Sequence, residues 1–526
     1  MSPHQQPMPI GKGRRDCRTM VDALRDAVAV APERVALRHG DRTLTYGQYG
    51  RCVAGLARLL GGFDVSGTRV ALVLPNGPEM AVCVFAGLAA QAQVTFINPA
   101  YPAPAMRPLL DDAAPSVVIT TAEVSDTARD LAAEYDIPVL EFGTEGLALD
   151  LWADDTTLSL DDLRRPSPDR LATLMYTGGT TGIPKGVDHT HANLLMTVQA
   201  MEACWPTDPG TETWLTVAPM FHIWGLLMGV LNPVYGRAEV ISFARFDPPA
   251  VVESMHRYGV SVFSGGPAAV YAGLLSAPRL RTADLSRLRV CPGGGSPFPL
   301  ELLARWHHVT GVPVREAFGM TELAPISCNP SASEPRPGSV GLPAPLVQIR
   351  ITDALDADVP VGEIGQVLAR APHMLRGYRN RPEETAQALA GGWLHTGDLG
   401  RFDEDGYLHI VDRIKDMILV GGFNVYPREI DEVLMAHPTV EESVTIGVAD
   451  ERKGERPVTF VAFAEGAGED IEELHRLCRD QLPAYKRPAE ILGVEAIPHT
   501  AANKVNRPRL REMWTQSRAE GRHETD

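Results

Sequence analysis

The sequence lacks the cysteine pattern of a disulfide framework or a zinc cluster. Its seven cysteines are odd in number, and none stands in a C-x-x-C pair. Paired or closely spaced cysteines are the usual signature of both kinds of site, so we expect neither. Such a chain fits a reducing compartment, which predicts a cytoplasmic protein.

Basic charge and long apolar runs are also scarce. The chain has 49 Lys and Arg residues against 66 Asp and Glu, which gives a formal net charge of −17. This balance argues against nucleic acid as the main partner, because a phosphate backbone requires clustered cations. No stretch approaches the roughly 18 uninterrupted apolar residues of a membrane-spanning helix, so we expect no span. The basic N-terminal stretch is not followed by the apolar segment of a secretory signal.

The chain does contain an alternation of helical and strand patterns. Its 526 residues exceed the roughly 250–300 at which a single core stops growing, so we expect more than one domain. Before residue 338, apolar runs such as 70–74 alternate with helical patterns such as 79–90, which predicts βαβ units. After it, patterns such as 348–352 predict antiparallel strands. We expect a flexible arm over 1–20, a large domain over 21–412 and a small α+β domain over 413–526.

The strongest local signal is the stretch YTGGTTGIPKGV at 176–187. Its glycines let backbone N–H groups converge on an anion with no Cβ in the way. The threonine hydroxyls add donors and Lys185 adds a positive charge, which is typical of a polyphosphate cradle. It is not a Walker loop, because the G-K-[ST] ending is missing, and the plain alternative is a flexible surface loop. The candidate phosphate-binding residues are Thr177, Gly178, Gly179, Thr180, Thr181, Gly182 and Lys185.

This loop resembles the signature loop of the adenylate-forming superfamily, which contains acyl-CoA synthetases, firefly luciferase and nonribosomal peptide adenylation domains. The stretch EAFGMTE at 316–322 resembles the family's second nucleotide motif, with Phe318 in place of the usual Tyr. The resemblance implies that Thr321 contacts the α-phosphate and that Glu322 holds Mg²⁺, which suits the charge neutralisation that attack on phosphorus requires. It also implies Thr177 as a metal ligand and contacts to adenine or the acyl group from Glu316, Ala317, Phe318, Gly319 and Met320.

Two further motifs imply residues that hold the ribose and the reacting groups. The stretch WLHTGDL at 393–399 resembles the motif whose Asp binds both ribose hydroxyls, and Asp398 is the matching residue. Without the motif, the plain alternative for Asp398 is an aspartate in a turn after Gly397, which is a common position for this residue type. Lys504 matches the catalytic lysine that contacts the acyl carboxylate and the α-phosphate. The family usually has Ser-Gly before this lysine and another lysine upstream, whereas this chain has Asn503 and His499.

The stretch 411–427 resembles the family's hinge and the opening of its small domain. The resemblance implies that Arg413 contacts ribose or phosphate and that Lys415 is the hinge residue. Gly421 and Gly422 match a turn that approaches the pantetheine arm of CoA, a role that suits glycine because the backbone passes close to the ligand. The plain alternative is a β-turn.

The acyl pocket is the last site that the resemblance implies. The apolar window 221–234 predicts a buried helix beside a pocket, and its start resembles the family's aromatic motif. A lone His in an apolar stretch is more often a satisfied core residue than a catalyst, so we assign His222 to the pocket lining. The expected pocket residues are His222, Trp224, Gly266 and Gly319. Gly294 and Gly295, in a stretch that resembles the Gly-rich turn under the adenine, are expected to contact the base or the substrate.

The resemblance runs from about residue 25 to 512 and is strongest to bacterial fatty-acid CoA ligases. It implies two αβ subdomains plus a β-barrel-like subdomain, followed by a small mobile lid. ATP and a carboxylic acid would give acyl-AMP and pyrophosphate, and CoA would then take the acyl group. The catalytic residues would be Lys504, Glu322, Thr177 and Lys185. Another acceptor (a carrier protein or an amine), a degenerate non-enzymatic relative, the identity of the acid and a homodimeric state all remain open.

Overall fold

The computed structural model describes residues 17–143, 147–177, 184–450, 452–464, 466–500 and 505–523. The chain forms two compact units. The first comprises the described residues up to Gly295 with Leu303–Ile349 and Ala369–Leu394, and the second comprises Ser296–Leu302, Arg350–Leu368 and the described residues from His395 onward. Within these described ranges, no helix has both the length and the apolar composition needed to cross a bilayer.

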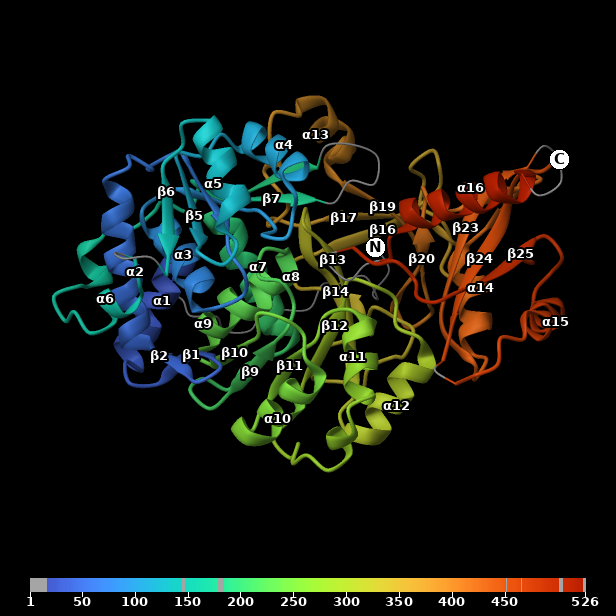
Figure 1. Ribbon diagram of the computed structural model, residues 1–526, viewed down its shortest axis with the longest axis horizontal. Coiled ribbons are helices and arrows are strands. Elements are labelled where there is room, and N and C mark those ends of the chain that lie inside the picture. Colours follow the sequence, from blue (N-terminus) through green and yellow to red (C-terminus); the bar gives the residue numbers. More distant parts are fainter. Residues whose placement is uncertain are drawn as a thin grey trace. The chain divides into compact units, whose positions relative to one another are not determined.

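The largest sheet of the first unit has seven strands. Its strands β5, β6 and β7 are labelled in Figure 1. Their order is β18 (Gly377–Tyr378), β8 (Lys185–Thr190), β7 (Leu171–Thr177), β4 (Gln93–Phe96), β3 (Arg69–Val73), β5 (Val117–Thr121) and β6 (Val139–Phe142). Strands β7 to β6 in this order run parallel, whereas β8 and β18 are antiparallel additions at one edge. Strands β3, β4 and β5 are buried along almost their whole length, so both faces of the sheet centre are covered, as parallel sheets require.

The helices of this region follow the predicted pattern. Helix α3 (Pro78–Ala89) is buried at every residue except Glu79, and a helix that is apolar all round belongs in a core. Helix α1 (Met20–Val30) begins with a capping box between Thr19 and Asp22. Thr19 and Met20 are fully buried, which places the end of any N-terminal arm before Thr19. The neighbouring helices are α2 (Tyr46–Gly61), α4 (Ala103–Ala113), α5 (Ser125–Glu134), α6 (Asp150–Ala153) and α7 (His191–Cys204).

Two further sheets complete the first unit. One has the order β11 (Val262–Ser264), β9 (Thr213–Thr216), β10 (Glu239–Ser242), β1 (Val35–His39) and β2 (Arg42–Thr45). The other has the order β12 (Cys291–Gly294), β13 (Val314–Met320), β14 (Leu323–Cys328) and β15 (Leu342–Pro343). A parallel bridge between Gly266 and Gly293 links the segment after β11 to β12. Helices α10 (Pro248–Tyr258), α11 (Ala268–Leu275) and α12 (Leu300–Thr310) belong to this part of the chain.

The apolar window 221–234 forms the expected buried helix, but with an irregular centre. It consists of α8 (Ile223–Leu226), a π-helical turn (Leu227–Leu231) and α9 (Asn232–Gly236). Gly225 is required here, because a Cβ at this position would lie 2.0 Å from the Pro219 carbonyl oxygen. Such π turns are frequent near functional sites, where the extra residue redirects a side chain.

The region after Gly338 contains an open antiparallel sheet. Its strand order is β16 (Gln348–Thr352), β17 (Gly365–Arg370), β19 (Leu394–Phe402) and β20 (Leu408–Arg413), and the boundary between the two units runs through β16, β17 and β19. The sequence predicted a barrel-like subdomain. Among the described strands no pairing joins β16 to β20, so the sheet does not close.

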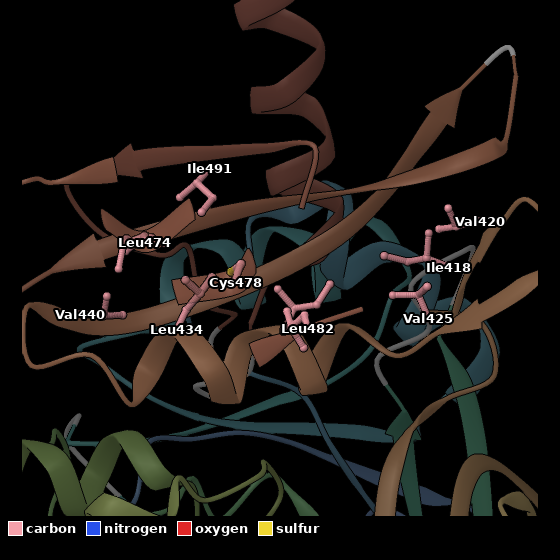
Figure 2. Packing of buried hydrophobic residues seen from close by; sticks show 11 residues of the cluster. Ile418, Val420, Val425, Leu434, Val440, Leu474, Cys478, Leu482 and Ile491 are labelled. Atoms are coloured by element: carbon pink, nitrogen blue, oxygen red, sulfur yellow. The ribbon is translucent and has the colours of Figure 1, made fainter. Parts of the chain in front are cut away.

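The end of the chain folds into a second α+β core within the second unit. The sheet order is β22 (Phe423–Val425), β21 (Ile418–Val420), β24 (Gly454–Phe463) and β23 (Val440–Asp450), with β25 (Glu490–Val494) paired to β24. Helices α14 (Pro427–Met435) and α15 (Ile471–Gln481) contribute Leu434, Leu474 and Cys478 to one apolar cluster, which Figure 2 shows against the sheet. Leu510 of α16 (Arg507–His523) packs in a separate cluster with Val444, Ile446 and Val448 of β23.

One disulfide joins Cys204 and Cys328, which the cysteine spacing did not predict. Their Cα atoms lie 6.7 Å apart although 124 residues separate them in the chain. The pair forms because the end of α7 packs against β14, a tertiary contact that no local pattern reveals.

Candidate active site

The candidate phosphate loop joins two paired strands. Thr177 ends β7 and Lys185 begins β8, the two residues are direct antiparallel partners, and the Thr177 hydroxyl donates to the Lys185 carbonyl oxygen at 3.4 Å. The loop residues Gly178, Gly179, Thr180, Thr181 and Gly182 lie outside the described residues. The expected strand before the loop and the expected helix from His191 are both present, whereas the intervening strand β8 was not predicted.

The base of this hairpin is fixed by a half-buried tyrosine and an aspartate. The Tyr176 hydroxyl donates to Asp112 Oδ2 at 2.9 Å, and Arg379 Nε donates to the Asp112 carbonyl oxygen at 2.6 Å. The Arg379 backbone N–H also donates to the Gly186 carbonyl oxygen at 2.8 Å. Burial raises the pKa of Tyr176, so its hydroxyl stays protonated and remains a donor. The two residues that flank the loop are therefore held on a rigid frame.

The second nucleotide motif forms the tight hairpin between β13 and β14. Ala317 pairs with Cys328 and Met320 with Leu323, so Thr321 and Glu322 lie at the turn. The register is irregular between Phe318 and Met320. Gly319 lies at this irregularity, where a Cβ would come within 3.3 Å of Ala324. The Glu316 side chain contacts the backbone of Gly338, because its Oε2 accepts a hydrogen bond from the Gly338 N–H at 3.2 Å.

Contacts from β8 and β18 bring Lys185 and Glu322 to the same side chain. Glu322 is only 5% exposed, and its Oε1 accepts a hydrogen bond from the Tyr378 hydroxyl at 2.8 Å. The Lys185 ammonium nitrogen lies 5.0 Å from the centroid of the Tyr378 ring. A cation and a buried carboxylate thus flank one tyrosine, beside Thr321 at the hairpin turn. This is the pair of charges that a metal-bound polyphosphate needs.

The residues assigned to adenine and to the acyl group also come together. Gly266 and Gly294 both lie against the Trp224 indole, because a Cβ built on either would be 3.4 Å or 3.3 Å from it. A Cβ on Gly294 would also lie 2.7 Å from the Ala317 carbonyl oxygen. Gly295 has a φ of +88° and open space at its Cβ position. His222 caps α8, where its Nδ1 accepts a hydrogen bond from the Trp224 N–H at 3.3 Å.

Asp398 and Arg413 are partners within the second unit. They face each other across β19 and β20, and Arg413 Nε lies 3.0 Å from Asp398 Oδ1. Asp398 is 3% exposed, so its carboxylate is held in place by a charged partner. Burial lowers the pKa of Lys415, the expected hinge residue, and the nearby Arg413 charge acts in the same direction.

Gly421 and Gly422 form the turn between β21 and β22 with φ values of +58° and +89°. Two consecutive left-handed residues are typical of a tight hairpin turn, so this geometry alone accounts for both glycines. Lys504 and Asn503 lie outside the described residues. Of that stretch, His499 is placed beside Glu442 with Nε2 to Oε1 at 3.0 Å, and this hydrogen bond raises the pKa of His499.

The donor set suits a magnesium ion that arrives with its nucleotide. Mg²⁺ is commonly bound by one or two carboxylates and substrate phosphates while it keeps several waters. Glu322 supplies one buried carboxylate and Thr177 one hydroxyl beside the loop. Within the described ranges, no group of three or more His, Cys, Asp or Glu side chains gathers as a metal cluster. These residues fit a metal that is held mainly by its nucleotide.

Comparison with known proteins identifies the family. The model of AMP-binding enzymes matches residues 24–379, and that of the AMP-binding enzyme C-terminal domain matches residues 429–504. The chain is 33% identical to a long-chain-fatty-acid–CoA ligase of Bacillus subtilis over 98% of its length and 97% of the relative. It is 36% identical to a feruloyl-CoA synthase of an Amycolatopsis species over 92% of its length and 97% of the relative. The chain therefore belongs to the AMP-binding enzymes of the adenylate-forming superfamily.

A solved structure agrees with this placement. The ATP-bound crystal structure of MatB from Rhodopseudomonas palustris superimposes with a TM-score of 0.88 at 29% identity. The match covers 94% of this chain and 99% of that one. The multi-subdomain α/β architecture that the sequence predicted is thus confirmed, apart from the barrel.

Sequence reasoning missed Tyr378, His189, Asp112 and Arg379. None belongs to a quoted motif. His189 and Tyr378 reach the site through the pairing of β8 and β18, whereas Asp112 of α4 reaches it through the Tyr176 hydroxyl. Tyr378 joins Glu322 because β18 pairs with β8, a contact between segments far apart in the chain. A Gly-Tyr dipeptide before a helix is too common a pattern to have identified it.

Proposed function

We propose that the protein is an ATP-dependent carboxylic acid:CoA ligase that forms an acyl-adenylate and then an acyl-CoA. The observation that carries this proposal is the convergence of Lys185 and Glu322 on Tyr378, next to Thr321. It supplies a cation, a carboxylate and a hydroxyl where a triphosphate chain needs them. The family and the named activities of the relatives support the same reaction.

The first half-reaction joins the acid to AMP. A carboxylate oxygen of the acid attacks the α-phosphorus of ATP, the bond to the β-phosphate oxygen breaks, and pyrophosphate leaves. Lys185 and the loop amides hold the phosphates, and Thr321 contacts the α-phosphate. Glu322 is the residue that would hold Mg²⁺, whose role is to neutralise phosphate charge. Asp398 binds the ribose diol, and Lys504 stabilises the charge that develops on the carboxylate and the α-phosphate.

We further propose that the acid is compact. The relatives named above act on acids as different as a long-chain fatty acid and ferulate. In this chain the Trp224 indole lies against Gly266, which the resemblance assigns to the acyl pocket, and against Gly294 of the neighbouring Gly-rich turn. A fixed indole at this point limits the length of the pocket. Its Nε1 is buried and has no acceptor among the described residues, so an acid with a polar oxygen near its far end would satisfy it.

The second half-reaction uses CoA. A cavity of about 180 Å³ in the second unit is lined by the cations Lys453, Arg456 and Arg487 and by one acid, Asp450, which lies 3.9 Å from Arg456. The Arg487 guanidinium is held by the carbonyl oxygens of Leu482 and Arg479, each at 2.9 Å. Such a cationic cavity suits the phosphates of CoA, whereas a simple amine acceptor would gain nothing from it. We place the enzyme in the cytoplasm, where ATP and CoA are supplied.

The decisive experiment is exchange of labelled pyrophosphate into ATP with a panel of carboxylic acids. We expect exchange with short aliphatic or aromatic acids and its loss in Glu322→Gln. Absence of exchange with every acid would refute adenylation and favour a nucleotide-binding relative without turnover.

A second assay identifies the acceptor. Preformed acyl-AMP is offered CoA, a phosphopantetheinylated carrier protein or an amine, and we expect CoA to consume it fastest. Lys453→Ala should raise the KM for CoA while the KM for ATP stays unchanged. Faster consumption by an amine or by the carrier protein would overturn the choice of CoA.

A further inference from the structure

The backbone of Tyr378 is held on two sides, by a strand and by a helix. Strand β18 pairs with β8 through Gly377 to Asp188 and Tyr378 to Val187. On the other side, the Tyr378 N–H donates to the Thr385 hydroxyl of helix α13 (Pro382–Ala388) at 2.9 Å. The direction of the phenol ring is therefore set by a sheet edge and a helix together.

The phenol group lies between two charges that the proposed reaction uses. Its hydroxyl donates to Glu322 Oε1 at 2.8 Å, and its ring lies 5.0 Å from the Lys185 ammonium nitrogen. The hydroxyl is the donor in this pair, because an ionised carboxylate has only acceptor oxygens.

The backbone of the Thr321–Glu322 turn has its own supports. His189 of β8 donates from Nε2 to the Thr321 carbonyl oxygen at 2.8 Å, and its Nδ1 accepts from the Thr173 hydroxyl at 3.2 Å. Burial lowers the pKa of His189 to about 4, so this ring is neutral. The Leu375 N–H donates to the Glu322 carbonyl oxygen at 2.8 Å. Loss of the Tyr378 hydroxyl would thus remove one hydrogen-bond partner of the Glu322 carboxylate and leave the backbone of the turn in place.

We propose that Tyr378 is a positioning residue for adenylation, which fixes the Glu322 carboxylate in the orientation that receives Mg²⁺-ATP and aligns it with Lys185. The inference rests on the proposed function, because it assumes that Glu322 meets the metal. A carboxylate can rotate about its last bond, and a hydrogen bond from a fixed phenol to one of its oxygens favours one orientation over the others. Groups that orient metal ligands in this way commonly change metal affinity or activity by about 10- to 100-fold when removed.

The test compares Tyr378→Phe with Tyr49→Phe. Tyr49 is a matched control, since its buried hydroxyl donates to a backbone carbonyl, that of Ala81, at 3.1 Å. Calorimetry on the full-length proteins should show Mg²⁺-ATP binding about 10-fold weaker in Tyr378→Phe. ATP binding in the presence of EDTA should change little. Tyr49→Phe should bind both forms like the wild type.

Kinetics of single and double variants distinguish a positioning role of Tyr378 from a general effect on the stability of the fold. In pyrophosphate exchange, Tyr378→Phe should lower kcat/KM for Mg²⁺-ATP while the KM for the acid stays unchanged. The same substitution in a Glu322→Gln background should have little further effect on Mg²⁺-ATP binding, because the carboxylate that Tyr378 orients is already absent. Equal loss of binding with and without Mg²⁺, or wild-type binding throughout, would overturn the inference. If the wild type exchanges pyrophosphate and Tyr378→Phe does so with the same kinetics, the role of Tyr378 is refuted but the proposed function stands. If the wild type shows no exchange, the proposed function itself is refuted.

Discussion

Truncation of Trp224 should lengthen the acids that the enzyme accepts. The indole lies against Gly266 and Gly294, so Trp224→Ala opens space in the direction of the acyl group. Each methylene that the enlarged pocket buries contributes about 0.8 kcal/mol, or roughly fourfold in kcat/KM. Three added methylenes should therefore gain about 60-fold over the wild-type profile. Trp224→Phe keeps a ring and should give an intermediate profile.

The assay is pyrophosphate exchange over a series of straight-chain acids, with kcat/KM plotted against chain length. Trp224 is partly exposed, so Trp224→Ala should cost less than the roughly 3–5 kcal/mol of a fully buried tryptophan. Thermal melting checks that the variant is folded. Identical chain-length profiles for Trp224→Ala and the wild type would show that the indole is not the pocket wall. A wild-type optimum at long-chain acids would contradict the compact acid directly.

Two further predictions concern the second unit. Lys504→Ala should abolish adenylation but spare thioester formation from supplied acyl-AMP, because the lysine acts on the transition state of the first half-reaction. Equal loss of both half-reactions would contradict this role. Burial raises the pKa of Asp431 to about 7, where its Oδ1 accepts from the Thr445 hydroxyl at 2.6 Å. The folded state thus keeps a proton that the unfolded state loses near pH 4, so stability falls as pH rises from about 4 to 7. Asp431→Asn should flatten this fall in the melting temperature, and an unchanged pH profile would refute the buried acid.

The sequence predicted elements whose periodicity was unambiguous. Strand β16 begins and ends at the predicted residues, because its alternation reflects one covered and one open face. Helix α3 agrees to within a residue, since an apolar stretch of that length after a Pro has few other solutions. Lys185 of the phosphate-loop motif and Glu322 of the second motif contact the same side chain, that of Tyr378.

What the sequence could not reveal depends on pairing between distant segments. Strand β8 mixes Lys, Asp and His with apolar residues and is a strand only because β7 and β18 flank it. The Tyr378 contact and the Cys204–Cys328 pair arise in the same way. The barrel was inferred from resemblance alone, and strand pairing decides closure.

The direction of the Trp224 side chain depends on the number of residues in the π-helical turn at Leu227–Leu231. A π turn holds one more residue than the α-helix would at the same place. Since each α-helical residue turns the axis by about 100°, deleting one residue there would restore regular hydrogen bonding and swing the upstream indole away from its two glycines. Acid selectivity in this protein would then be open to change by a single-codon deletion that alters no residue facing the substrate.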